Sequence, residues 1–169
     1  MRNIFAATLI GLCLVSCAKK PVIEKEKYVV LHYRGTLADG SEFDSSQGGE
    51  PLAFICGAGL MIPGFEAGIA GLRAGEKKTI TVKAKDAYGD YDQSRLFPVS
   101  REHFPPGFVF ETGLQILIET TAGPLHALIA DIMDTEILVD CNPPLAGKDL
   151  TFEVEILEVR DPTEEERSL

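Results

Sequence analysis

Alternation between apolar and polar residues is the strongest pattern in this chain, and it is clearest near the C-terminal end. Every second residue from Leu150 to Ile156 is apolar, and the residues between them are Thr or Glu. Side chains of a strand point alternately to its two faces, so this pattern predicts a half-buried strand. The same period places Val29, Leu31 and Tyr33 on one face of an earlier strand, and it predicts a further strand from Lys78 to Ala84.

One short helix and several turns are predicted between these strands. The pair Asp39-Gly40 favours the positive φ of a hairpin turn, so Glu42 to Asp44 is expected to form the returning strand. Another short strand is predicted from Pro51 to Cys56. Pro63 suits the first turn of a helix, where its missing N–H does no harm. Apolar residues then follow at i, i+4 and i+7, which is one face of a helix: Phe65, Ile69 and Leu72.

The block between Asp92 and Asn142 has a pattern of its own. Ser100 can cap a single helical turn, and three short apolar segments separated by turn residues then predict a small meander. Roughly fifty residues bury only a small core, so this block is expected to depend on its host. The predicted fold is α+β, an antiparallel sheet packed on one short helix with an inserted small β-rich subdomain. The three segments of the meander are Leu114–Ile118, Leu125–Ile132 and Thr135–Val139.

Composition narrows the possible partners. The chain has 169 residues, of which 45% are hydrophobic and 25% charged, as in an ordinary globular protein. Its formal net charge is -10. Nucleic acids and anionic lipid surfaces are both disfavoured, because binding to phosphate depends on Lys and Arg. An acidic surface instead suits basic or apolar peptide segments.

The first sixteen residues read as a signal peptide. Arg2 is followed by an almost uninterrupted apolar run from Ile4 to Val15, which is shorter than the roughly 20 residues needed to span a bilayer. The sequence Leu14-Val15-Ser16-Cys17 resembles a bacterial lipobox, which implies cleavage before Cys17 and lipid on that residue. Residues 17–27 would then form the lipidated start and a tether. The alternative is an ordinary secretory signal in which Cys17 is incidental.

Four cysteines are present. If the signal-peptide prediction holds, Cys13 is removed with the peptide and Cys17 carries the lipid. The other two, Cys56 and Cys141, are far apart and belong to no CxxC motif, so no zinc site is predicted. An exported protein could join them in a disulfide. The alternative of two buried free thiols is favoured mildly, and the sequence alone leaves the choice open.

Motifs for covalent chemistry are mostly absent from the sequence. The pair Glu42 and Asp44 shares one face of a strand, but such pairs are common on solvated faces. The three histidines, at positions 32, 103 and 126, have no neighbouring ligand at metal spacing, so no metal is expected. Aromatic residues spread along the chain could line a concave face, although composition alone favours a role in the core. They are Tyr33, Phe43, Phe54, Phe65, Tyr88 and Phe152.

Five ordered segments resemble the FKBP-type prolyl isomerases. The interruption after Tyr88-Gly89-Asp90-Tyr91-Asp92 and the return near Asn142 are similar to the insert-in-flap domain of the SlyD-like subgroup. The resemblance runs from Val29 to Arg160. The five segments are Val30–Ser46, Pro51–Phe54, Met61–Glu66, Asp86–Gly89 and Leu150–Val154.

The resemblance implies a set of site residues. Catalytic roles would fall to Tyr33, Asp44, Ile62 and Tyr88. Substrate would be bound by Phe43, Leu52, Phe54, Met61, Phe65 and Phe152. Phe65 stands where many members have Trp, and Leu52 where many have an aromatic residue, so the pocket has less aromatic area and macrolide-type inhibitors should bind weakly. Clients of the insert would be bound by Leu114, Ile116, Ile118, Leu125 and Ile129.

The resemblance also implies a function and a division of the chain. The expected activity is peptidyl-prolyl cis-trans isomerisation in unfolded clients, with a holding activity from the insert. The alternative is a chaperone with a weak or vestigial isomerase pocket. Metal delivery is disfavoured because the tail contains no His. The expected parts are a signal peptide at 1–16, an isomerase domain at 28–92 and 142–160, an insert at 93–141 and an acidic tail at 161–169.

No cofactor is expected, and no nucleic-acid partner. The expected partners are unfolded or partly folded chains that contain X-Pro bonds, and the membrane through the lipid on Cys17. The protein is expected to be a monomer. Ala18 follows the lipidated residue in place of the Asp that retains many bacterial lipoproteins, so the periplasmic face of the outer membrane is favoured, with the cell surface as the other destination.

Overall fold

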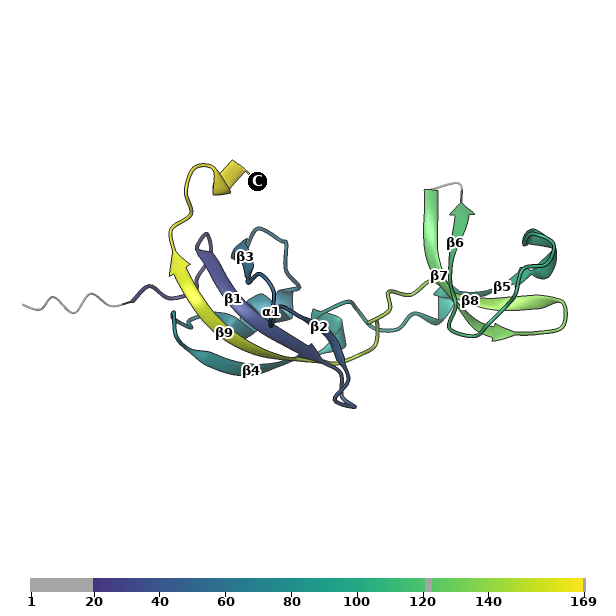
Figure 1. The fold of residues 1–169 in the computed structure, drawn as a ribbon, viewed down its shortest axis with the longest axis horizontal. Helices are drawn as coiled ribbons and strands as arrows, with labels where there is room; N and C mark the ends of the chain where they lie inside the picture. Colours follow the sequence, from purple (N-terminus) through teal and green to yellow (C-terminus); the bar gives the residue numbers. More distant parts are fainter. Residues whose placement is uncertain (1–19, 121–122, 169) are drawn as a thin grey trace, which may run out of the picture.

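The computed structural model describes residues 20–120 and 123–168. Figure 1 shows two sheets at opposite ends of an elongated molecule, joined by two extended stretches of chain. The first sheet packs on the helix, and the described chain begins at the end of the molecule that is far from the second sheet. Within the described residues, no helix is long and apolar enough to cross a membrane.

The first sheet is antiparallel and has five strands. Its order is β2-β1-β9-β4, and β3 pairs with another part of β1. The predicted alternation is confirmed in β9, where Phe152 and Val154 are buried while Glu153 is exposed. The strands are β1 (Tyr28–Thr36), β2 (Glu42–Ser45), β3 (Leu52–Ile55), β4 (Lys77–Val82) and β9 (Leu150–Arg160).

The predicted short helix is α1 (Pro63–Ile69), with Pro63 in its first turn. Phe65 and Ile69 are buried against the sheet, as their spacing predicts. Gly68 allows the helix to approach β4 closely, because a Cβ at this position would lie 2.7 Å from Ile80 Cδ1. The helix is therefore held by packing against β4 more than by its own propensity.

Residues 17–27 were expected to form a tether, but the chain already contacts the first domain at Val22 and Ile23. Val22 forms an isolated bridge with Arg73, and Ile23 is only 1% exposed. The Ile23 N–H donates to the Leu72 carbonyl at 2.8 Å, and the Ile23 carbonyl accepts from Gly71 N–H at 2.9 Å. One buried isoleucine within a mixed polar segment gives no periodic signal, so the sequence pattern did not reveal this docking.

The second sheet is also antiparallel and has four strands in the order β5-β8-β7-β6. The three predicted segments correspond to β6 to β8. Strand β5 was not predicted because it contains Pro98, but it lies at the edge of the sheet, where proline is tolerated. The strands are β5 (Leu96–Ser100), β6 (Gln115–Thr120), β7 (Gly123–Ile132) and β8 (Glu136–Asp140).

Four short 3-10 helices complete the described structure. The predicted cap is confirmed in η3, where the Ser100 side chain accepts from Glu102 N–H. The end of the chain is ordered by Glu166, which forms two short hydrogen bonds with the Arg160 guanidinium, at 2.6 and 2.7 Å. These elements are η1 (Ala84–Asp86), η2 (Gln93–Arg95), η3 (Arg101–His103) and η4 (Glu166–Ser168).

Each sheet has its own hydrophobic core, and each core contains one free, buried thiol. Cys56 belongs to the core of the first sheet and Cys141 to that of the second. Of the two possibilities that the sequence left open, the structure has the free thiols. Burial raises the pKa of both thiols, so they are less reactive than an exposed cysteine.

Candidate active site

A pocket of about 210 Å³ lies between the first sheet and the start of α1. It brings together nearly all of the pocket residues expected from the sequence, although they come from several separate segments. Phe54 is the exception, because it is 3% exposed and packs behind Phe65. Leu60 lines the pocket and was not expected. The lining residues are Tyr33, Phe43, Asp44, Leu52, Leu60, Met61, Ile62, Phe65, Tyr88 and Phe152.

Aromatic rings in edge-to-face contact form the floor of the pocket. The ring centroids of Phe65 and Phe152 are 5.0 Å apart with an interplanar angle of 74°. Phe43 meets Phe152 at 5.7 Å and 85°, and Tyr33 meets Phe65 at 6.4 Å and 76°. Contacts of this geometry are favourable beyond the area they bury, so the floor is a rigid apolar surface.

A short hydrogen bond joins two of the expected catalytic residues at the mouth of the pocket. The Tyr33 hydroxyl donates to Asp44 Oδ2 at 2.6 Å, and the Ser45 N–H donates to Asp44 Oδ1 at 2.8 Å. Burial of the ring, and then the bond to Asp44, raises the pKa of Tyr33 to about 12. The phenol therefore remains a hydrogen-bond donor at neutral pH and fixes the carboxylate beside the aromatic floor.

Ser46 holds the segment that carries Asp44 against the strand that carries Tyr33. Its Oγ accepts from Tyr33 N–H at 2.9 Å, and its own N–H donates to the Tyr33 carbonyl at 3.0 Å. His32 Nδ1 lies 3.1 Å from the same Oγ. Ser46 was not expected to have a role in the site. The one available signal was its place just after a strand, where serine often bonds to the backbone.

The rim of the pocket is more exposed than its floor. Leu60 is 68% exposed and Tyr88 is 47% exposed. Ile62 directly precedes α1, where backbone N–H groups have no partner within the helix and are available to a carbonyl. Tyr88 is followed by Gly89, whose φ of 86° is in the region that favours glycine. The rim thus combines apolar side chains with hydrogen-bond donors that could bind the carbonyl groups of an extended peptide.

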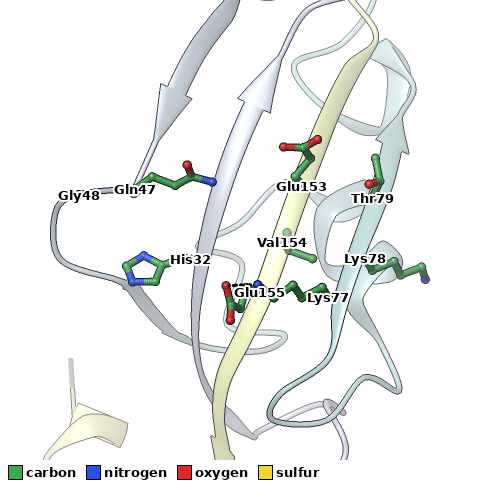
Figure 2. A pocket seen from close by; sticks show the side chains of 9 residues that line it. All are labelled: His32, Gln47, Gly48, Lys77, Lys78, Thr79, Glu153, Val154 and Glu155. Atoms are coloured by element: carbon green, nitrogen blue, oxygen red, sulfur yellow. Dashed lines mark ion pairs between the residues drawn. The ribbon is translucent and has the colours of Figure 1, made fainter.

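A larger hollow of about 660 Å³ lies on the outer face of the same sheet (Figure 2). Its lining is polar, and Lys77 and Glu155 form an ion pair across it at 2.9 Å. No Phe or Tyr side chain lines it, so it offers no large apolar ring against which a proline could pack. Its lining residues are His32, Gln47, Gly48, Lys77, Lys78, Thr79, Glu153, Val154 and Glu155.

The second sheet carries an apolar groove of about 830 Å³, here called the second-sheet groove. Leu114, Ile116 and Ile118, three of the expected client-binding residues, line it. Leu125 is exposed but lies outside the groove. The expectation for Ile129 is wrong, because it is 1% exposed within the core. The groove is lined by Val99, His103, Phe104, Pro105, Phe108, Leu114, Gln115, Ile116, Leu117, Ile118 and Glu119.

Comparison with known proteins agrees with this geometry. Residues 19–157 match the model of the FKBP-type peptidyl-prolyl cis-trans isomerase family. The chain therefore belongs to this family and is a peptidyl-prolyl cis-trans isomerase that acts on proline-containing protein chains.

Similar proteins include members of the SlyD group. The FKBP-type isomerase SlyD of Escherichia coli K12 is 35% identical over 144 residues, which cover 85% of this chain and 74% of SlyD. SlyD of Vibrio cholerae is 36% identical over 144 residues, covering 85% and 72% of the two chains. A probable FKBP-type 16 kDa isomerase of Pseudomonas fluorescens is 33% identical over 132 residues, covering 78% and 88%. The chain is thus SlyD-like.

Proposed function

We propose that this isomerase accelerates X-Pro rotation in unfolded protein clients with the pocket on the first sheet, while the second sheet, as an insert-in-flap domain, holds those clients. The observation that carries the first half is the Tyr33–Asp44 hydrogen bond beside the aromatic floor. The alternative, a chaperone with a vestigial pocket, is less consistent with a pocket whose polar and apolar parts are both intact.

Rotation about an X-Pro bond must break amide resonance, which raises a barrier of about 18–20 kcal/mol. No covalent bond is made or broken, so the pocket needs no nucleophile. Phe65 and Phe152 would hold the proline ring in an apolar environment. The twisted amide has less charge separation than the planar one, so removal from water favours the transition state over the ground state.

Polar groups at the rim would hold the peptide on either side of the turning bond. We assign the Ile62 N–H and the Tyr88 hydroxyl to two carbonyls of the substrate. Asp44, held by Tyr33 and Ser45 N–H, would lie against the rotating carbonyl as a fixed electrostatic group that transfers no proton. Leu60 and Met61 complete an apolar rim for the neighbouring side chains.

The holding function is supported by the second-sheet groove. Leu117 is 55% exposed and Leu114 is 36% exposed, and apolar patches of this kind usually mark binding sites. The groove also contains Phe104 and Phe108, whose ring centroids lie 5.2 Å apart. A client held there would present its prolines to the pocket at a raised local concentration.

One paired experiment tests both halves. Wild type should accelerate cis-to-trans relaxation of a short X-Pro peptide and suppress aggregation of an unfolded client. The double variant Leu114→Ser, Leu117→Ser should keep peptide isomerisation and lose most of the client holding. Absence of any peptide acceleration in wild type would favour the vestigial-pocket alternative. Unchanged holding in the double variant would remove the groove from the proposal.

Lipid anchoring is the third part of the proposal. Its evidence is the sequence Leu14 to Cys17, which lies outside the described residues. Because Val22 and Ile23 are docked, the five chain steps from Cys17 to Val22 reach at most about 18 Å. A lipid on Cys17 would therefore keep the first sheet close to the membrane. The second sheet would then lie at the end of the molecule that points away from the membrane. The periplasmic face of the outer membrane is the favoured location.

Anchoring can be tested with a matched pair of cysteine variants. Metabolic labelling with a fatty acid should mark the wild-type protein and the Cys13→Ser variant, because the proposed cleavage removes residue 13. The Cys17→Ser variant should take up no label and should be released in soluble form. Equal labelling of all three proteins, or none in any, would contradict the anchor.

A further inference from the structure

Two connectors run between the sheets, residues 87–95 and residues 140–149, and they lie side by side (Figure 1). They are hydrogen-bonded to each other at both ends. Gly147 N–H donates to the Gly89 carbonyl at 2.8 Å near the first sheet, and Cys141 N–H donates to the Arg95 carbonyl at 3.0 Å near the second. The connectors therefore form a bridge that is held together by hydrogen bonds, and it is stiffer than two free linkers.

Asn142 lies toward the second-sheet end of this bridge and is a buried polar residue, 8% exposed. Its side-chain Oδ1 accepts from Asp92 N–H at 2.9 Å, and its Nδ2 donates to the Asp92 carbonyl at 3.0 Å. The same Nδ2 donates to Asp140 Oδ1 at 2.8 Å. The amide thus pairs with the opposite connector through both a donor and an acceptor, as a neighbouring strand would.

Asp140 extends this network to a second residue of the first connector. Its Oδ1 accepts from Asn142 N–H at 2.8 Å, and its Oδ2 accepts from the Tyr91 hydroxyl at 2.7 Å. Burial opposes ionisation of Asp140, but the bonds from Asn142 and Tyr91 outweigh it and lower its pKa. The carboxylate therefore stays charged and keeps accepting from both connectors near neutral pH.

Close packing limits movement at the first-sheet end of the bridge. A Cβ at Gly147 would lie 2.9 Å from Tyr91 Cβ, so no larger residue fits there without a shift. Gly147 also has a φ of 73°, which favours glycine. The first connector contains Tyr88, which also lines the pocket.

We propose that Asn142, together with Asp140 and Tyr91, is a clamp that fixes the direction of the second sheet relative to the isomerase pocket. Asn142 is then a positioning residue for protein clients. The functional part of this inference rests on the proposed holding role of the second-sheet groove. A fixed bridge keeps a held client within reach of the pocket, whereas free connectors would let the two sites swing apart and lower the effective concentration of prolines.

The orientation itself is tested by residual dipolar couplings of the backbone N–H groups. In wild type, the couplings of both sheets should fit a single alignment tensor. In Asn142→Ala they should require two. The control Gln93→Ala removes an exposed side chain from the opposite connector, one residue after Asp92, and should behave as wild type. Tyr91→Phe removes only the hydroxyl, so it should fold normally and loosen the bridge to a smaller degree.

The functional readout is catalysis of proline-limited refolding of a protein client. In Asn142→Ala, kcat for the client should fall about tenfold, because delivery to the pocket becomes less effective, while KM stays nearly constant because the groove is unchanged. Isomerisation of a short peptide should change less than about twofold. Tyr91→Phe should show the same split between client and peptide with a smaller loss, and Gln93→Ala should show none.

Two outcomes would overturn the clamp. One is a wild-type protein that already needs two alignment tensors. The other is an Asn142→Ala variant that keeps a single tensor and the full client kcat. Failure of the holding role is distinguishable, because the groove variant Leu114→Ser, Leu117→Ser would then leave client binding unchanged whatever the tensors show.

Discussion

Phenylalanine is used in opposite ways in the two halves of this molecule. In the first, Phe54 and Phe65 are 3% exposed and Phe152 is 6% exposed, all within one core. In the second, the phenylalanines pack only partly against a core of small and β-branched residues. In the first half, phenylalanine thus forms a fixed floor that suits a single proline ring. In the second half, it forms an open, adaptable surface. The partly buried rings of the second half are Phe97, Phe104, Phe108 and Phe110.

Burial explains this difference. The first sheet is covered by α1 and by the docked Ile23, whereas the second-sheet groove remains uncovered. A rigid pocket suits a reaction that depends on one geometry, and an open apolar groove suits many unfolded sequences.

The largest expected effect separates the two kinds of phenylalanine by stability. Phe65→Ala should lower the free energy of unfolding by about 3–5 kcal/mol, because a fully buried ring leaves a cavity. Phe108→Ala, which removes a partly buried ring, should lower it by about 1 kcal/mol or less. Urea unfolding of the two variants measures this difference. Equal losses would mean that the second-sheet groove is as tightly packed as the pocket.

The next effect separates the two halves by activity. Asp44→Ala should reduce kcat/KM for a short X-Pro peptide by about 10- to 100-fold, because a fixed charge beside the rotating carbonyl is lost. Client holding should not change. Glu42→Ala is the matched control, since Glu42 shares the strand but pairs with Arg34, 2.6 Å away, outside the pocket. If kcat/KM fell by a similar factor in both variants, the loss would come from the change in net charge and not from the position of Asp44.

The smallest effect concerns the response of the pocket to alkaline pH. The pKa of Tyr33 is raised to about 12 in the folded protein, above its value of 10.0 in an unfolded chain. The folded state therefore keeps this proton longer, so the resulting stability is complete below pH 10 and is lost as pH rises from about 10 to 12. The free energy of unfolding, measured at several alkaline pH values, should fall more steeply with rising pH in wild type than in Tyr33→Phe. Parallel curves would show that the raised pKa does not contribute.

Much of the fold could be predicted from the sequence because the alternating strands are long and clearly bounded. Strand β5 could not, since Pro98 argues against a strand unless its place at the edge is known. The burial of Ile129 also escaped prediction. Leu125 and Ile129 are four residues apart in β7, so the strand period places them on the same face. Leu125, however, lies near the end of the strand, whereas Ile129 lies in the core.

The candidate site could be predicted as a set of residues only through the family resemblance. The pattern of apolar residues could not distinguish Phe54, which packs behind the floor, from Phe65, which lines it. Leu60 and Ser46 were missed for a related reason. Their roles depend on where a loop lies against distant strands, and no periodicity records that position.

The two buried thiols give each half of the molecule its own reporter of local opening. Cys56 and Cys141 lie in separate cores, and burial raises the pKa of each, so a thiol reagent must wait for the surrounding structure to open. The rate at which each cysteine is modified therefore measures how often its own half unfolds. In a single sample, without any introduced label, modification of Cys141 before Cys56 would identify the half that contains the second sheet as the less stable unit.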